Sequence, residues 1–162
     1  MAITLRAPRG LSRLAPALRA LVRATLAAQG CRAGEIGIVL ARDPDLRTLN
    51  RSWRGIDRAT DVLSFGYDGL RSPAPGSARP TRISGDLVIS LDRVAAQARR
   101  YRVSRGEELA RLTVHGTLHL AGLDHQRAAE RRSMRRREDL ALAAAAAAVR
   151  ALDRLFAGVP GR

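Results

Sequence analysis

The chain has 162 residues and a formal net charge of +14, and all 29 of its lysine-or-arginine positions are arginine. This length suffices for one domain with a buried core, without disulfides or an obligatory structural metal. The single cysteine, Cys31, excludes an internal disulfide and fits a reducing cytosol. The longest apolar run, residues 141–149, is too short to span a bilayer. The charge favours polyanionic partners, with nucleic acid first and an anionic membrane surface second.

Strands and helices alternate in the first third of the chain. Residues 3–5 are predicted to form a short strand, and leucines at helical spacing indicate a helix over about 11–28. An arginine-rich transit peptide is the less favoured interpretation of this segment. Apolar residues at every second position predict a strand over 35–41. Asp43, which is followed by proline, is predicted to cap a helix that runs to about residue 53.

The middle of the chain combines short β-prone runs with a region rich in turn formers. Residues 60–65 are predicted to form a strand beside the functional site. Residues 66–83 hold three of the seven prolines and are expected to form a loop or flap. A short apolar strand is expected at 87–89, followed by a helix over about 91–101.

A capping box marks the next helix. Ser104 and Glu107 form the pattern S-x-x-E, which predicts a helix from there to Ala121. A last helix over about 127–156 is favoured by the high helix propensity of alanine. No repeat or linker divides the sequence, so we expect one domain over 1–162. The order of elements predicts an α+β fold, in which a small mixed sheet packs against several helices.

All three histidines of the chain lie within the segment HGTLHLAGLDH. On a helix, His115 and His119 are four residues apart and share a face. Gly122 can end the helix in the left-handed conformation, which would bring His125 back toward the other two. Three neutral imidazoles with an open fourth position are typical of a catalytic zinc site rather than a structural one. Nickel, copper and manganese are alternatives, and for any one histidine alone a hydrogen-bonded core position is the simpler interpretation.

The spacing HxxxHxxGxxH is also that of metzincin metallopeptidases. In those enzymes a glutamate follows the first histidine and deprotonates the zinc-bound water. Here that position is Gly116, so a peptidase of this type would lack its general base. A metal at this site can still polarise a phosphoryl oxygen. An anionic substrate would then require a positive group near the site.

Three sequence blocks carry a resemblance to a known family. They read LNRSWRGIDRATDVLSF at 49–65, GDLVIS at 85–90, and the histidine segment itself. Together they resemble the YbeY family of bacterial, metal-dependent endoribonucleases that process rRNA. The resemblance runs in register over nearly the whole chain. Met134 and Glu138 also match the family's spacing after the last histidine.

The resemblance implies a set of site residues. It implies that His115, His119 and His125 hold one Zn²⁺ and that Arg54 is catalytic. A guanidinium facing the metal could hold the scissile phosphate through two hydrogen bonds and stabilise the transition state. Further candidates for substrate contact or for orienting a ligand are Thr60, Asp61, Ser64 and Asp124. A packed core strand for the first three, and a capped turn for the last, are the alternatives.

The resemblance also implies a function. The expected protein is a cytoplasmic, zinc-dependent endoribonuclease, a hydrolase of phosphodiester bonds, which is specific for single strands. It would mature the 3′ end of 16S rRNA and act in ribosome quality control. Its expected partners are single-stranded RNA, rRNA and the ribosome or its small subunit, with neither membrane nor DNA. The alternatives are a non-catalytic RNA-binding assembly factor with a structural zinc and, less favoured, a metzincin-like metallopeptidase.

Overall fold

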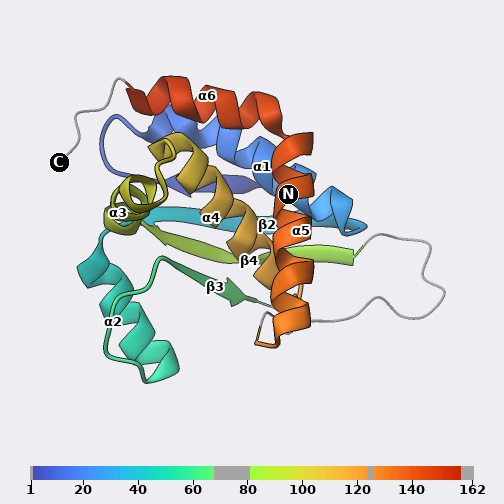
Figure 1. The fold of residues 1–162 in the computed structure, drawn as a ribbon. Coiled ribbons are helices and arrows are strands. Elements are labelled where there is room, and N and C mark those ends of the chain that lie inside the picture. The colour runs from blue at the N-terminus through green and yellow to red at the C-terminus, as the bar shows by residue number, and fades with distance from the viewer. Residues whose placement is uncertain (1, 68–80, 124–125, 158–162) are drawn as a thin grey trace.

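A four-stranded mixed sheet forms the centre of the protein in a computed structural model that describes residues 2–67, 81–123 and 126–157 (Figure 1). The strands lie in the order β1-β2-β4-β3. Strands β1, β2 and β4 are parallel, and β3 pairs antiparallel with β4 at one edge. Their bounds are β1 Ile3–Arg6, β2 Cys31–Ala41, β3 Val62–Gly66 and β4 Thr81–Ser90.

Helices cover the two faces of this sheet unequally. Their bounds are α1 Ala15–Ala28, α2 Asp43–Arg54, α3 Leu91–Tyr101, α4 Arg105–Leu120, α5 Ala128–Ala144 and α6 Ala146–Ala157. Helix α2 lies on one side of the sheet, and the other helices lie on the opposite side (Figure 1). No helix in the described part of the chain is long and apolar enough to cross a membrane. The predicted α+β class, a small mixed sheet packed against several helices, is confirmed.

The larger part of the core lies between the sheet and α4. Leu109, Leu112 and Leu118 of α4 are at most 1% exposed and belong to the same cluster as the inward residues of α1, β2 and β4. Burying each leucine contributes about 1.5–3 kcal/mol relative to exposing it. Helix α4 is therefore fixed on the sheet along most of its length.

A second, smaller core lies under α2 on the other face. It consists of Leu46 from α2, Leu63 from β3 and Val88 from β4, with Phe65 packed beside them. Since side chains alternate along a strand, Leu63 and Phe65 face α2, while Val62 and Ser64 face α4. The edge strand β3 thus has α2 on one face and α4 on the other.

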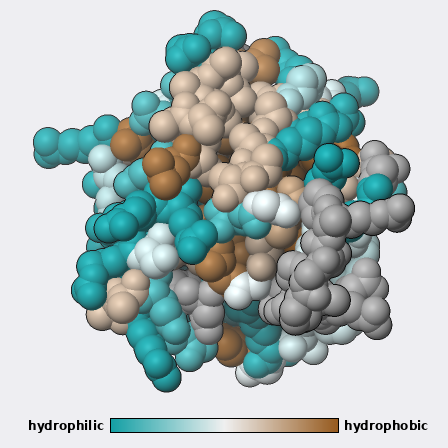
Figure 2. Space-filling model, turned by 90° about the vertical axis from the view of Figure 1, so that its right-hand side faces the viewer, coloured by the Kyte–Doolittle hydropathy of each residue, from teal (hydrophilic) through white to brown (hydrophobic). Residues whose placement is uncertain are grey.

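Hydrophilic side chains cover much of the molecular surface. Figure 2, a view onto the right-hand side of Figure 1, shows a paler, weakly hydrophobic area surrounded by hydrophilic side chains. Exposed side chains at the junction of α5 and α6, which lies on this side, are Leu140, Ala143, Ala144 and Ala147.

The predicted last helix is wrong in one respect, because it is two helices. At Ala145 the backbone leaves the helical conformation, with φ −105° and ψ 28°, between α5 and α6. The break lets α6 turn back over α1 and α4, where Leu152 and Phe156 become buried. Alanine propensity favours helix on both sides of the break and cannot indicate where tertiary packing will bend the chain.

Four smaller expectations also differ from the structure. Strand β4 begins at Thr81, so residues 81–83 are not loop; they pair with Cys31–Ala33 of β2, which is likewise longer than predicted. Residues 68–80 of the predicted loop lie outside the described residues. The N-cap of α2 is Arg42 rather than Asp43, and the first helix begins with a 3-10 turn at Ser12–Leu14.

Gly106 provides a test of the packing between α4 and α6. A Cβ added there would lie 2.6 Å from the backbone nitrogen and 2.8 Å from the Cα of Asp153. We expect Gly106→Ala to lower the free energy of unfolding in urea by about 1–3 kcal/mol, the usual cost of overpacking. For Gly66→Ala, where no described atom lies within 4 Å, we expect a change within about 0.5 kcal/mol. Equal losses for the two variants would contradict the packing.

Candidate metal centre

The helix α4 that carries two of the histidines begins where its capping box predicts. The Ser104 hydroxyl accepts a hydrogen bond from the Glu107 backbone N–H at 3.0 Å, and the Glu107 carboxylate accepts one from the Ser104 N–H at 3.4 Å. This start fixes which residues of α4 turn inward. His115 and His119 consequently occupy its last two turns, each partly buried.

The two histidines converge through the same ring nitrogen. Nε2 of His115 lies 3.0 Å from Nε2 of His119. The ring centroids are 4.7 Å apart, and the planes are inclined by 68°. The expected common face of the helix is therefore present, and both Nε2 atoms point to one place. Imidazole nitrogens in this arrangement suit a shared metal ion such as zinc.

The chain turns sharply directly after the pair. Gly122 has φ 96°, in the left-handed region that glycine tolerates without strain. The backbone N–H of Gly122 donates a hydrogen bond to the carbonyl of His119 at 3.0 Å. The backbone N–H of Leu123 donates one to the carbonyl of Leu118 at 3.1 Å. The predicted glycine turn is thus present. Asp124 and His125 lie outside the described residues, so the third ligand stays a prediction.

A carboxylate from α5 contacts the other nitrogen of His115. Glu138 Oε1 is hydrogen-bonded to Nδ1 of His115, and Glu138 is only 6% exposed. The sequence associates Glu138 with the family by its spacing and gives no sign of this contact, because the two residues are 23 positions apart. Carboxylates in this relation to a metal-binding histidine fix the tautomer and the ring orientation.

A second buried carboxylate lies on α4 itself, about two to three turns before the histidines. Glu108 is 1% exposed and accepts two hydrogen bonds from the guanidinium of Arg111, at 2.7 and 3.2 Å. These bonds raise the pKa of Arg111, and the nearby charges of Glu138 and Asp61 raise it further. Sequence reasoning assigns Glu108 no role. In the structure it binds the Arg111 guanidinium through two hydrogen bonds.

Gly116 faces the sheet and not the space beside the histidines. Its carbonyl accepts a hydrogen bond from the Ser64 hydroxyl at 2.9 Å. A Cβ at this position would lie 3.0 Å from both Leu87 Cδ2 and Val62 Cγ2. The packing of α4 on β3 and β4 therefore crowds any side chain at the position that supplies the base in metzincins.

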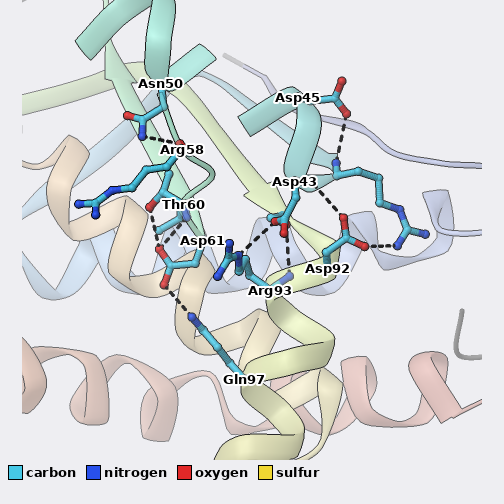
Figure 3. A network of polar contacts seen from close by, with 12 residues as sticks. Asp43, Asp45, Asn50, Arg58, Thr60, Asp61, Asp92, Arg93 and Gln97 are labelled. Atoms are coloured by element: carbon cyan, nitrogen blue, oxygen red, sulfur yellow. Dashed lines mark hydrogen bonds and ion pairs between the residues drawn. The ribbon is translucent and has the colours of Figure 1, made fainter. Parts of the chain in front are cut away.

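Thr60, Asp61 and Ser64 make their described polar contacts within the fold. Asp61 accepts hydrogen bonds from the Val62 backbone N–H at 2.8 Å, from the Thr60 hydroxyl at 3.5 Å and from Gln97 of α3 at 3.3 Å (Figure 3). The Ser64 hydroxyl donates its hydrogen bond to the Gly116 carbonyl of α4. These contacts fit the packed-strand alternative, since they join β3 to α3 and α4.

A neighbouring network, also in Figure 3, fixes the start of α2. Asp43 accepts from the Ser90 hydroxyl at 2.6 Å and from Arg93 at 3.2 Å, which joins α2 to the junction of β4 and α3. The Asp92 carboxylate accepts a hydrogen bond from the Asp43 backbone N–H at 2.9 Å. This bond, together with the hydrogen bond and charge of Arg42, lowers the pKa of Asp92. The helix that ends in Arg54 is thus firmly held at its beginning.

Arg54 is the last residue of α2 and is exposed. The residue before it, Trp53, contacts Phe65 with ring centroids 6.1 Å apart, and is still 72% exposed. Arg54 therefore lies on the α2 side of β3, whereas the histidines lie on the α4 side. Within the described part of the chain, no contact joins Arg54 to the histidine pair, so the expected approach across a cleft is not seen directly.

The fold and the site together define a class, an α+β protein with a candidate histidine metal centre at the end of a buried helix. The family profile described as "Endoribonuclease YbeY" matches residues 10–146. A protein of that name from an Anaeromyxobacter species is 50% identical over 81% of this chain and 64% of its own length. Another, from Chloroflexus aurantiacus, is 46% identical over 76% of this chain and 79% of its own length. The chain belongs to the YbeY family.

The lengths and one solved structure complete this comparison. The chain spans slightly less than two thirds of the Anaeromyxobacter relative and about four fifths of the Chloroflexus one. The solution structure of a Thermotoga maritima protein is similar over 98% of this chain and 99% of that one, with a TM-score of 0.59 and 21% identity. That similarity supports the fold alone.

The close approach at Gly116 can be tested by a double-mutant cycle. We expect Gly116→Ala to lower the free energy of unfolding by about 1–3 kcal/mol because its Cβ would press on Val62 and Leu87. In a Val62→Ala background the same substitution should cost less, since one of the crowding methyl groups is gone. Equal costs in both backgrounds, measured in urea, would show that Val62 does not restrict position 116.

Proposed function

We propose that this protein is a metal-dependent endoribonuclease that cleaves single-stranded RNA, with one Zn²⁺ held by His115, His119 and His125. The observation that carries the proposal is the convergence of two Nε2 atoms, 3.0 Å apart, at the end of α4. It occurs in a chain whose family profile and curated relatives bear the name endoribonuclease. The glycine turn after the pair supports His125 as the third ligand, because the chain turns at Gly122, three residues before it.

The donor set fits a catalytic zinc ion. Three imidazoles bind zinc at about 2.0–2.1 Å and leave its fourth position to water or substrate. When bound, the ion supplies Lewis acidity toward a phosphoryl oxygen and lowers the pKa of water. The protein's own part is to hold the imidazoles in place, through the burial of α4 and the contact of Glu138 with His115.

Arg54 is the proposed catalytic arginine. Its guanidinium can hold a phosphate through two hydrogen bonds and offset the negative charge of the transition state. Because β3 is the edge strand of the sheet, an RNA strand can pass over its outer edge from Arg54 on one face toward the histidines on the other. The net charge of +14 favours such a strand over a neutral or basic substrate.

Two routes for the nucleophile fit the proposal. Either water attacks the phosphorus, or the RNA 2′-hydroxyl attacks and leaves a 2′,3′-cyclic phosphate. The surroundings of the histidines favour neither, because position 116 is a glycine and offers no base, and the carboxylates of Glu138 and Asp61 are already hydrogen-bonded. Analysis of the product ends separates the two routes.

We also propose the cellular role that family membership implies. The enzyme matures the 3′ end of 16S rRNA and acts in ribosome quality control, in the cytoplasm, with the ribosome or its small subunit as partner. Neither a membrane nor DNA is part of this role. The main alternative is a non-catalytic RNA-binding assembly factor with a structural zinc, and the position of Arg54 on the far side of β3 favours it.

Cleavage of an end-labelled single-stranded RNA by zinc-loaded protein tests this function. We expect His119→Ala to abolish cleavage and Arg54→Ala to lower kcat/KM by about 100-fold or more, as for the loss of a charge that stabilises a transition state. Arg23→Ala removes an equal charge from an exposed position of α1 and should leave cleavage unchanged. Equal cleavage by all four proteins, or none by the zinc-loaded wild type, would favour the assembly factor.

Trp53 gives a second test, directed at RNA binding alone. An exposed indole beside an arginine can stack on an unpaired base, a contact that contributes about 1–3 kcal/mol per base. We expect Trp53→Ala to weaken the binding of single-stranded RNA by this amount in fluorescence anisotropy, and Trp53→Phe to retain most of it. Leu140→Ala removes another exposed hydrophobic side chain, which is 62% exposed, and serves as the control. Equal affinities of the Trp53→Ala and Leu140→Ala variants would exclude stacking on Trp53.

A further inference from the structure

We propose that Glu138 is a positioning residue of the metal centre, which fixes the His115 imidazole with its proton on Nδ1 and thereby presents the lone pair of Nε2 to the metal. This inference rests on the proposed zinc site and adds a residue from a different helix to it. The group that touches the metal remains His115, and Glu138 acts through it.

The position of Glu138 in α5 is unusual for a carboxylate. Helix α5 turns three residues inward, Met134, Glu138 and Ala141, which follow one another at intervals of four and three along one face. They are 3%, 6% and 1% exposed. An apolar side chain would be expected between two such neighbours, because burying a carboxylate is costly unless it is paired and hydrogen-bonded. The buried carboxylate therefore requires a partner, and that partner is His115.

In the proposed arrangement, Nδ1 of His115 carries the proton and donates a hydrogen bond to Glu138, since an ionised carboxylate only accepts hydrogen bonds. A neutral imidazole has a single N–H, which leaves Nε2 as the unprotonated nitrogen. Nε2 of His115 is also the atom that lies 3.0 Å from Nε2 of His119. By keeping the proton on Nδ1, the carboxylate leaves the lone pair of Nε2 available to the proposed metal ion.

A positive charge lies near the carboxylate. Arg111, one turn before His115 on α4, is held by two hydrogen bonds to Glu108. The negative charges of Glu138 and Asp61 also raise the pKa of Arg111. Arg111 therefore offsets part of the negative charge that Glu108 and Glu138 bring to the buried side of α4.

The test compares zinc affinity in four proteins. Glu138→Ala removes the acceptor, and Glu138→Gln retains an acceptor oxygen without the charge. Asp139→Asn removes the same charge from the exposed adjacent position of α5 and is the matched control. Zinc affinity is measured by competition with a fluorescent chelator, and folding by circular dichroism. We expect the affinity to fall by about 10–100-fold for Glu138→Ala, the usual effect of losing such a partner, with a smaller fall for Glu138→Gln and none for Asp139→Asn.

A second readout reports the tautomer itself, in the metal-free protein. Long-range nitrogen–proton NMR spectra distinguish protonated Nδ1 from protonated Nε2. We expect His115 of the wild type and of Asp139→Asn to carry its proton on Nδ1, and Glu138→Gln to shift part of the population to Nε2. This readout does not depend on zinc or on nuclease activity, and it does not require Glu138→Ala to fold.

The possible results separate the inference from the proposed function. A wild type with protonated Nε2, or equal zinc affinities for Glu138→Gln, Glu138→Ala and Asp139→Asn, would overturn the role of Glu138. If Glu138→Ala does not fold, the comparison of Glu138→Gln with Asp139→Asn decides. A wild type that binds no zinc while His115 carries its proton on Nδ1 would overturn the metal site, and with it the role of Glu138 toward a metal.

Discussion

The contact of α4 with the sheet at Gly116 is the constraint on which the site depends. There the helix approaches β3 and β4 so closely that a Cβ would lie 3.0 Å from side chains of both strands. The Ser64 hydroxyl reinforces the approach by donating to the Gly116 carbonyl. With position 116 directed at the sheet, His115 and His119 on the neighbouring part of the helix surface stay partly accessible. The same contact crowds the position that carries the general base in metzincins, and this chain has a glycine there.

Local signals in the sequence predict the parts of the site that depend on neighbouring residues. The capping box at Ser104 and Glu107 predicts the start of α4, helical spacing predicts the pairing of His115 with His119, and a glycine predicts the turn at Gly122. Contacts between distant segments leave no such signal. Glu138 meets His115 across 23 residues, and the bend at Ala145 arises only because α6 packs on α1 and α4.

The arrangement of α2 and α4 about β3 suggests how the proposed substrate would be held. The histidine pair lies on one side of this edge strand, while Trp53 and Arg54 lie at the end of the helix on the other side. Both elements are firmly anchored, α4 by leucines in the core and α2 by Asp43 and its neighbours. A flexible single strand can follow the edge from one side to the other, whereas a stiff duplex is less able to do so. The proposed preference for single-stranded RNA, which family membership implies, is compatible with this geometry.

X-ray absorption at the zinc edge, on protein loaded with one equivalent of zinc, tests the central claim most directly. We predict three imidazole nitrogens and one further oxygen or nitrogen at about 2.0–2.1 Å, and one imidazole fewer in His119→Ala. A sulfur neighbour at about 2.3 Å would place the zinc at Cys31 instead, and an unchanged spectrum in His119→Ala would place it away from α4. Either result would contradict a metal centre built on the histidine pair.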